Sequence, residues 1–565
     1  MKFLLTAINA KYIHSNLGVH SLKAYAKAHG CKNDLQIELA EYTINQSLEE
    51  ILQDIYLRKP GAIGFSCYIW NIQYVIRLIR NLSKILPDVD IWLGGPEVSY
   101  CAKEVMTREP SVTGIMVGEG EASFEELMTF YMQSCPRKVH RNSLSEIGGI
   151  VFRDLSGNVV KTKSRPLLNL DDIPFPYEEL EGMEHRIIYY ESSRGCPYSC
   201  SYCLSSIDKK VRFRSLELVK KELDYFLEHK VPQVKFVDRT FNCKKSHALS
   251  IWRYLLEHDN GITNFHFEIA ADLIDEEELE VLKQMRLGLI QLEIGVQTTN
   301  PETITEINRK MDLTKLKNVV THINSFQNIH QHLDLIAGLP YENIESFKKS
   351  FDEVYRMRPQ QLQLGFLKVL TGSPMAERAK EYQLQFREEP PYEVLSTSWL
   401  SFDDILELKA VENMVELHYN SRQFTETLKE MEKHWKSPYA MFADIARYYR
   451  KRKLSGMSHG RLARYEILFE FLKELKGQTT NQMERYRDLL MYDIYLRENA
   501  KSRPTFARNL GPYKHKIRKF FEKEELRQVG KMVHLEIMRD GSMVLFDYRE
   551  RNPLTYNAKA VRVDE

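Results

Sequence analysis

The fold and the chemistry of this chain are decided by one short stretch, Ser193-Arg194-Gly195-Cys196-Pro197-Tyr198-Ser199-Cys200-Ser201-Tyr202-Cys203. Its cysteines have the spacing C-x3-C-x2-C. Three thiolates on one loop can hold three irons of a cubic iron–sulfur cluster and leave the fourth iron open to another ligand. Two alternatives remain: a zinc site short of one ligand, completed by a histidine, and loop cysteines that hold no metal.

The sequence around this stretch predicts a partial βα barrel. Apolar runs typical of strands alternate with amphipathic segments of helical length, such as Leu216 to Glu228. The predicted strands are Ile188 to Ser192, Val234 to Asp238, Phe265 to Ala270, Ile290 to Gly295, His332 to Ala337 and Leu362 to Val369. Eight such units make a complete barrel, so six predict an incomplete, TIM-like one. Active sites of parallel barrels lie at the carboxyl ends of the strands, and the cysteines directly follow the first strand.

The residues before the barrel predict an open, doubly wound parallel sheet of the flavodoxin-like kind. Five apolar runs alternate with helical patterns: Lys2 to Ile8, Leu35 to Ala40, Ala62 to Ser66, Asp90 to Leu93 and Gly114 to Val117. Distinctive residues follow these runs: Asn9 to Gly18, Cys67 to Asn71, Gly94-Gly95-Pro96-Glu97 and Gly118-Glu119-Gly120-Glu121. Because ligands of such sheets bind beyond the carboxyl ends of the strands, we expect a ligand crevice there.

The chain therefore divides into an α/β domain at 1–135, a linker with a β-hairpin at 136–186, the partial barrel at 187–375 and a mostly helical domain at 376–565. The linker ends in a proline-stiffened segment, Asp171 to Pro176. The clearest helical patterns of the last domain are Ile405 to Leu417, Pro438 to Tyr449 and Arg464 to Leu475. A terminal β-hairpin is predicted from Val533 to Met538 and from Met543 to Tyr548.

Composition and charge exclude several classes of protein. Of the 565 residues 28% are charged and 43% hydrophobic, which is typical of a globular chain. Lys and Arg number 79 against 78 acidic residues, which gives a net charge of +1. The overall charge therefore does not attract nucleic acid or a membrane, and any such partner needs a local patch. No apolar run reaches the about 18 residues of a membrane span, and the apolar start reads as a strand. Eight sparse cysteines exclude a disulfide framework, and we expect a cytoplasmic protein.

The cysteine stretch, at this place in a partial barrel, resembles the radical S-adenosylmethionine (SAM) superfamily. The resemblance covers Ile187 to about Pro374 and includes Tyr202, the aromatic residue before the third cysteine. It implies that Cys196, Cys200 and Cys203 hold a 4Fe-4S cluster whose open iron binds SAM. It further implies that one electron from the reduced cluster cleaves SAM to a 5′-deoxyadenosyl radical, which abstracts hydrogen from an unactivated carbon.

Other strand ends carry implied cofactor contacts. Asp238 follows the second strand, where the family usually binds the methionine amine, although it can also cap a helix. Glu293, on the fourth strand, matches a position that touches the sugar or amino-acid part of SAM, and a buried structural pair is the alternative. Gly338, in Leu335 to Pro340, resembles the fifth-strand motif that lets adenine approach the backbone. The usual GGE form after the second strand is absent.

The first domain resembles that of the cobalamin-binding subgroup of the superfamily. The resemblance implies that Gly94, Gly95, Glu97, Gly118 and Glu119 line the path of the corrinoid. Tight βα turns also need such glycines. The D-x-H-x-x-G signature is absent and Tyr12 to Gly18 stands in its place, so we expect no axial histidine, His14 included.

Methylthiotransferases also carry a flavodoxin-like domain before the barrel, with cysteines for a second cluster. In this chain the ligands of a second cluster would have to be Cys31, Cys67 and Cys101. Cys31 belongs to the opposite edge of the predicted sheet, which disfavours that interpretation.

The last domain contains two basic segments, at 447–464 and 501–519, each with seven Lys or Arg and no acidic residue. With interleaved tyrosines they suit a phosphate or RNA contact, and they suit a plain solvated surface as well.

The predicted function is that of a radical SAM enzyme, cobalamin-dependent, that methylates an unactivated carbon and needs a reductant such as flavodoxin or ferredoxin. The alternatives are a cobalamin-free radical SAM enzyme acting on RNA, a methylthiotransferase-like enzyme and a metal-binding interaction protein. The sequence does not name the substrate.

Overall fold

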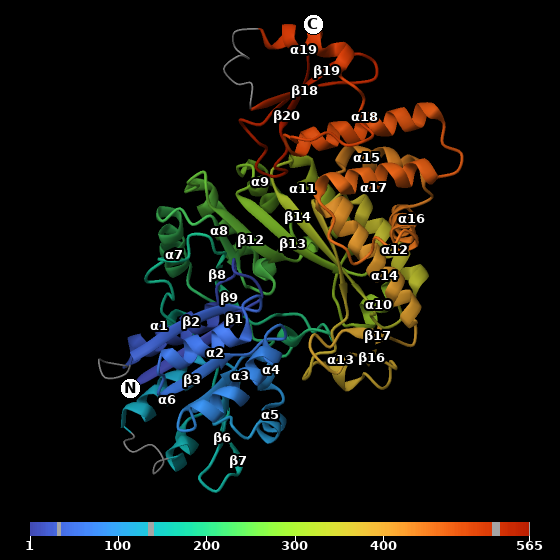
Figure 1. Ribbon diagram of the computed structural model, residues 1–565. Helices are drawn as coiled ribbons and strands as arrows, with labels where there is room; N and C mark the ends of the chain where they lie inside the picture. The colour runs from blue at the N-terminus through green and yellow to red at the C-terminus, as the bar shows by residue number, and fades with distance from the viewer. Residues whose placement is uncertain (31–35, 134–140, 523–531, 564–565) are drawn as a thin grey trace. The chain divides into compact units, whose positions relative to one another are not determined.

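The computed structural model describes residues 1–30, 36–133, 141–522 and 532–563 (Figure 1). Contacts divide the chain into two compact units. The first comprises Met1–Leu292, Ile304–Asp312 and Phe366–Ser398, and the second comprises Glu293–Thr303, Leu313–Gly365 and Trp399–Glu565. The cysteine loop and the α/β domain both belong to the first unit.

The α/β domain is built on a sheet with the strand order β2-β1-β3-β4-β5-β6-β7. Its parallel strands are β1 (Lys2–Asn9), β2 (Gln36–Thr43), β3 (Ala62–Ser66), β4 (Asp90–Gly94) and β5 (Gly114–Met116), as predicted. Its helices are α1 (Leu17–His29), α2 (Leu48–Leu57), α3 (Ile72–Ile85), α4 (Pro96–Ser99), α5 (Ala102–Arg108) and α6 (Glu121–Gln133). The predicted hairpin forms β6 (Ile150–Arg153) and β7 (Val159–Lys161), which extend this sheet in antiparallel pairing.

Alternation along β1 explains why helices cover both faces of this sheet. Leu4 and Ile8 belong to one buried cluster, with side chains of α2, α3 and α5. Phe3, Leu5 and Ala7 belong to the other, with side chains of α1 and α6. Because both faces of the strand are buried, β1 reads in the sequence as one continuous apolar run.

The barrel sheet has six strands in the order β15-β14-β13-β12-β11-β8, which confirms the predicted partial barrel. The strands are β8 (Ile188–Tyr190), β11 (Gln233–Phe236), β12 (Asn264–Ile269), β13 (Ile290–Gln297), β14 (His330–Ala337) and β15 (Gln361–Phe366). The helices are α7 (Leu216–Glu228), α8 (Lys245–Glu257), α9 (Glu276–Gln284), α10 (Pro301–Glu306), α11 (Leu313–Phe326) and α12 (Ile344–Arg356). Two short strands, β9 (Ser193–Arg194) and β10 (Arg212–Phe213), pair as a ribbon on either side of the cysteine loop.

The remainder is mostly helical, as predicted. After α13 (Pro374–Glu377) and the strand pair β16 (Gln385–Phe386) and β17 (Val394–Ser396) come α14 (Phe402–Met414), α15 (Thr425–Met431), α16 (Pro438–Lys451), α17 (Arg461–Glu474), α18 (Thr480–Arg497) and α19 (Lys514–Phe521). The predicted terminal hairpin is β18 (Val533–Ile537) with β19 (Met543–Asp547), and a third strand that was not predicted, β20 (Lys559–Val563), pairs with β19. Within the described residues, no helix combines the length and the apolarity needed to span a bilayer.

Candidate functional site

The three cysteines of the C-x3-C-x2-C stretch lie on one loop after β8 and β9. All three are free thiols; Cys196 and Cys200 are buried and Cys203 is partly exposed. Gly195 has a φ of +97°, and a Cβ there would lie 2.6 Å from the carbonyl oxygen of Lys210. Only glycine fits this turn, which leads the chain from the strand into the cysteine loop.

The loop is anchored by the segment that follows α10. The backbone N–H of Ser201 donates to the carbonyl of Ile307 at 3.0 Å. Arg309 places a guanidinium nitrogen 3.9 Å from Cys200 Sγ and 3.3 Å from the Tyr202 hydroxyl. Burial raises the pKa of the Cys200 thiol, and Arg309 opposes that rise. A cation beside a sulfur ligand stabilises the thiolate form that binds iron.

Two residues after β11 also lie close to Cys196. Its sulfur is 3.7 Å from the Thr240 hydroxyl. Cys243, which stands alone in the sequence, lies near enough that burial and then the Cys196 thiol raise its pKa to about 11. The fold therefore brings a fourth thiol into the neighbourhood of the loop.

Asp238 is fully buried and is held by the strand that leads into the cysteine loop. Its carboxylate accepts from the Ser192 N–H at 3.0 Å, the Ser192 hydroxyl at 2.7 Å and the Ser193 hydroxyl at 2.5 Å. Burial raises its pKa to about 6. The helix-cap alternative is wrong, because α8 begins at Lys245 with Lys244 as its cap. The contact with the SAM amine stays a prediction.

In the second unit, β13 and β14 gather polar groups. Glu293 lies with His332 and Asp334, and their ligand atoms are all within 4.8 Å of one another. Gln297, the last residue of β13, has a φ of +70°, and its buried Oε1 has no hydrogen-bond partner among the described residues. Such left-handed backbone in a non-glycine residue is typical of functional sites. Gly338, directly after β14, has a φ of +94°.

The strand order reverses at β1, which stands between β2 and β3, and the predicted ligand crevice at this switch point stays a prediction. Gly95 has a φ of +108°, and a Cβ there would lie 2.5 Å from the Cys67 carbonyl oxygen. Large apolar side chains at these strand ends remain exposed: Tyr12 60%, Ile13 44%, Trp70 42% and Tyr100 45%. An exposed apolar set beside glycine turns suits a large planar ligand.

His14 turns toward the barrel. Its Nδ1 lies 2.7 Å from the Tyr189 hydroxyl on β8, and burial followed by Lys11 lowers its pKa. The partner of Glu97 is Tyr392, whose hydroxyl donates at 2.5 Å. Gly94 ends β4, and a Cβ added at Gly118 would meet no atom within 4 Å. The corrinoid contacts of these residues stay predictions.

The methylthiotransferase alternative gains no support from the described residues. Cys67 is fully buried, which raises the pKa of its thiol to about 12 and disfavours the thiolate that a cluster needs. Cys101 is partly exposed, and Cys31 lies outside the described residues.

Several basic side chains of the two segments in the last domain pair with carboxylates. Ion pairs join Arg447 to Asp444, Arg452 to Glu474, Arg461 to Glu498, Arg503 to Glu536 and Arg508 to Asp488. These pairs fit a solvated surface better than a phosphate-binding one.

Three protein-family models match separate parts of the chain: a B12 binding domain at residues 4–128, the radical SAM superfamily at 190–354, and a protein of unknown function (DUF4080) at 380–558. TokK of Streptomyces tokunonensis, a cobalamin-dependent radical SAM methyltransferase, is 25% identical over 349 residues, 58% of this chain and 50% of TokK. The chain thus spans about half the length of that relative.

Two solved structures share the fold. OxsB, a cobalamin-dependent S-adenosylmethionine radical enzyme with aqua-cobalamin and S-adenosylmethionine bound, gives a TM-score of 0.61 at 16% identity over 94% of this chain and 83% of OxsB. TsrM, a methyltransferase from Kitasatospora setae with cobalamin and a 4Fe-4S cluster bound, gives 0.55 at 15% identity over 69% of this chain and 82% of TsrM.

The chain therefore joins a B12 binding domain to a radical SAM domain, as the sequence predicts. The chain is similar in this to TokK and OxsB, both described as cobalamin-dependent radical SAM proteins.

Proposed function

We propose that this protein is a cobalamin-dependent radical SAM enzyme that methylates an unactivated carbon of a substrate still to be found. The observation that carries the proposal is the loop with Cys196, Cys200 and Cys203, free thiols gathered behind an obligatory glycine turn. The B12 binding domain before the barrel and the methyltransferase relatives support the cobalamin-dependent form.

In this proposal the three thiolates hold the cluster, and Arg309 stabilises their ionised form. Gln297 offers an unsatisfied buried acceptor to SAM, and Gly338, with its positive φ, is the proposed neighbour of the adenine. When bound, the cluster with SAM would supply a 5′-deoxyadenosyl radical, and the corrinoid would supply a methyl group.

The first domain offers its strand ends to the corrinoid. Gly94 and Gly95 stand at these strand ends, with Gly95 packed against the Cys67 backbone, and Trp70 and Tyr100 offer apolar contact to the macrocycle. We expect no axial ligand from His14, because the D-x-H-x-x-G signature is absent from the sequence. A flavodoxin or ferredoxin is the proposed electron donor, and free thiols with an oxygen-sensitive cluster suit the cytoplasm.

An anaerobic titration of the cluster-reconstituted protein with cob(II)alamin, followed by electron paramagnetic resonance, tests the proposal. We expect one cobalamin per chain and a cobalt signal without nitrogen splitting, together with 5′-deoxyadenosine formation from SAM. SAM cleavage without cobalamin binding would overturn the cobalamin-dependent form. Absence of both cleavage and cluster would overturn the radical SAM assignment.

A further inference from the structure

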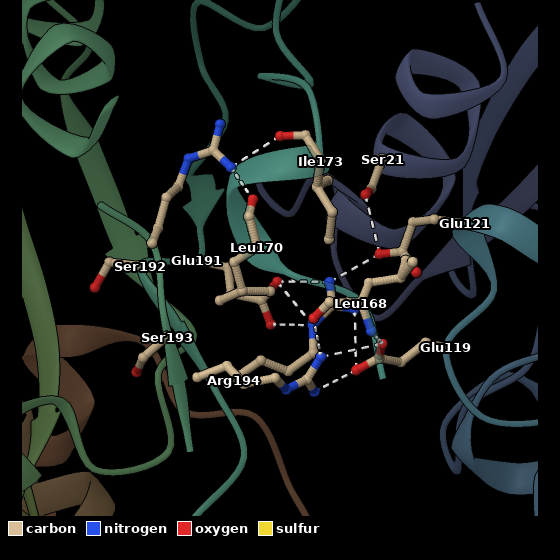
Figure 2. Close-up of polar contacts among 12 residues, drawn as sticks. Ser21, Glu119, Glu121, Leu168, Leu170, Ile173, Glu191, Ser192, Ser193 and Arg194 are labelled. Atoms are coloured by element: carbon tan, nitrogen blue, oxygen red, sulfur yellow. Dashed lines mark hydrogen bonds and ion pairs between the residues drawn. The ribbon is translucent and has the colours of Figure 1, made fainter. Parts of the chain in front are cut away.

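Two glutamates contact Arg194, the residue at the end of β9: Glu119 in the turn after β5, and Glu121 at the start of α6 (Figure 2). Glu121 accepts from Arg194 Nη2 at 2.8 Å and from the Ser21 hydroxyl at 3.3 Å. Glu119 lies 3.5 Å from Arg194 Nη1, and Glu191 lies 2.7 Å from Nη2. One arginine side chain therefore joins the α/β domain to the strand that enters the loop.

Arg212 completes the network from the other side. Its Nη1 lies 3.2 Å from Glu119 Oε2 and donates to the Leu168 carbonyl at 2.7 Å, while the Leu168 N–H donates to Glu119 at 3.0 Å. Burial opposes ionisation of Glu119, but the bonds from Arg212 and Leu168 hold its pKa below the usual value.

The pairing of β9 with β10 gives Glu119 an electrostatic role, beside Glu191 on Arg194 and Asp208 on Arg212. Arg194 and Arg212 are directly opposite in this two-residue ribbon. Like charges opposite each other in an antiparallel pair repel, and a carboxylate between them converts the repulsion into attraction. Glu121 is only 5% exposed, so without Arg194 its carboxylate would be a buried unpaired charge, whereas Arg194 without Glu121 would keep Glu119 and Glu191.

The ribbon also sets the position of the first cluster ligand. Arg194 precedes Cys196 by two residues. Gly195 between them has a backbone conformation that only glycine can adopt here. Cys196 N–H donates to the Asp208 carbonyl at 3.1 Å, and Asp208 in turn lies 3.2 Å from Arg212. Movement of Arg194 or Arg212 would therefore be passed to the cysteine loop.

We propose that Glu119 and Glu121 are positioning residues that lock the cysteine loop to the α/β domain, and that Glu119 is not a corrinoid ligand. The lock fixes the distance between the cluster and the corrinoid. The statements about the corrinoid and about its distance from the cluster rest on the function proposed above. The attachment of the cysteine loop to the α/β domain does not.

Hydrogen–deuterium exchange of the full chain tests the lock. In Glu119→Gln and in Arg194→Gln we expect exchange to rise roughly tenfold both at residues 117–121 and at residues 190–196. Arg194→Lys keeps the charge but not the fork geometry and should recover part of the protection. The matched control is Arg80→Gln, which breaks a pair with Glu109 inside the α/β domain and should leave residues 190–196 unchanged.

Unchanged exchange at 190–196 in Glu119→Gln, or a response confined to the mutated segment, would overturn the lock. The outcome does not depend on whether cobalamin binds.

The positional role is measured in the reconstituted protein as the relaxation enhancement of the cob(II)alamin signal by the reduced cluster. We expect Glu119→Gln to bind cob(II)alamin as tightly as the wild type and to lose much of this enhancement. A large loss of cobalamin affinity would instead make Glu119 a corrinoid ligand, and an unchanged enhancement would remove the positional role. A wild type without a cluster contradicts the proposed function and leaves the exchange result to decide the lock.

Discussion

Arg309 is the residue near the cysteine loop with the clearest electrostatic consequence. A positive charge 3.9 Å from Cys200 Sγ favours the cluster state that carries the additional electron. We expect Arg309→Gln to lower the cluster midpoint potential by on the order of 50 mV. Arg309→Lys should lie between the two, and a redox titration followed by electron paramagnetic resonance measures all three. Equal potentials in the wild type and Arg309→Gln would refute the electrostatic role.

The four neighbouring thiols should separate into two groups. Alanine at Cys196, Cys200 or Cys203 should each abolish 5′-deoxyadenosine formation and reduce the iron content, because the cluster loses one of its three protein ligands. Cys243→Ala, the matched control from the same neighbourhood, should keep both. Iron analysis and product chromatography after anaerobic reconstitution provide the measurement. Turnover that persists in Cys200→Ala would contradict the assignment.

The sequence could predict these ligands because their spacing is local. It could not predict Arg309, since the contact with Cys200 joins residues 109 positions apart. Gln297 was not predicted either. It is distinguished by a left-handed backbone conformation, and the residue types of a strand do not indicate such a conformation. Asp238 was singled out as a site residue, which stays a prediction, and its burial between two serines depends on how β8 and β11 pair.

At the scale of the element, apolar periodicity located the parallel strands of both sheets well. A continuous apolar run such as Ala62–Ser66 and an alternating one such as Ile290–Gln297 both indicate a β-strand. Pairing was harder to predict: nothing in Ile150–Arg153 says that it continues the first sheet rather than forming a separate hairpin. β20 is short and mostly exposed, so its sequence carries little periodic signal.

The π-helical segment Val415–Asn420 that continues α14 contains a titratable group in the core. His418 is fully buried, and burial lowers its pKa to about 4 despite a hydrogen bond with the Met414 carbonyl. Because the unfolded chain binds this proton near pH 6.5, stability is complete above that pH and is lost as the pH falls toward 4. The loss amounts to up to about 3 kcal/mol.

His418→Gln should therefore flatten the acid limb of the unfolding free energy, measured by urea denaturation between pH 6.5 and 4. His322→Gln, at an exposed position of α11, is the control and should retain the wild-type slope. A wild-type slope in His418→Gln would show that other groups govern the acid limb.

At the scale of the whole molecule, the charge balance argues against RNA as the substrate. The net charge is +1, and arginines of both basic segments pair with carboxylates. We expect fluorescence anisotropy with labelled transfer RNA to show no binding tighter than about 1 μM at physiological salt. A submicromolar affinity with a steep salt dependence would revive the RNA alternative.

The lock formed by Glu119 and Glu121 also bears on the order of events during synthesis. Glu121 and Arg194 are 73 residues apart, and Glu119 and Arg212 are 93 apart. The α/β domain can therefore fold on the ribosome with both carboxylates still hydrated, and the arginines arrive later. Contacts that form last hardly influence the folding rate, so weakening the lock should mainly accelerate unfolding. The attachment of the cysteine loop thus contributes to the lifetime of the folded protein more than to the speed of its formation.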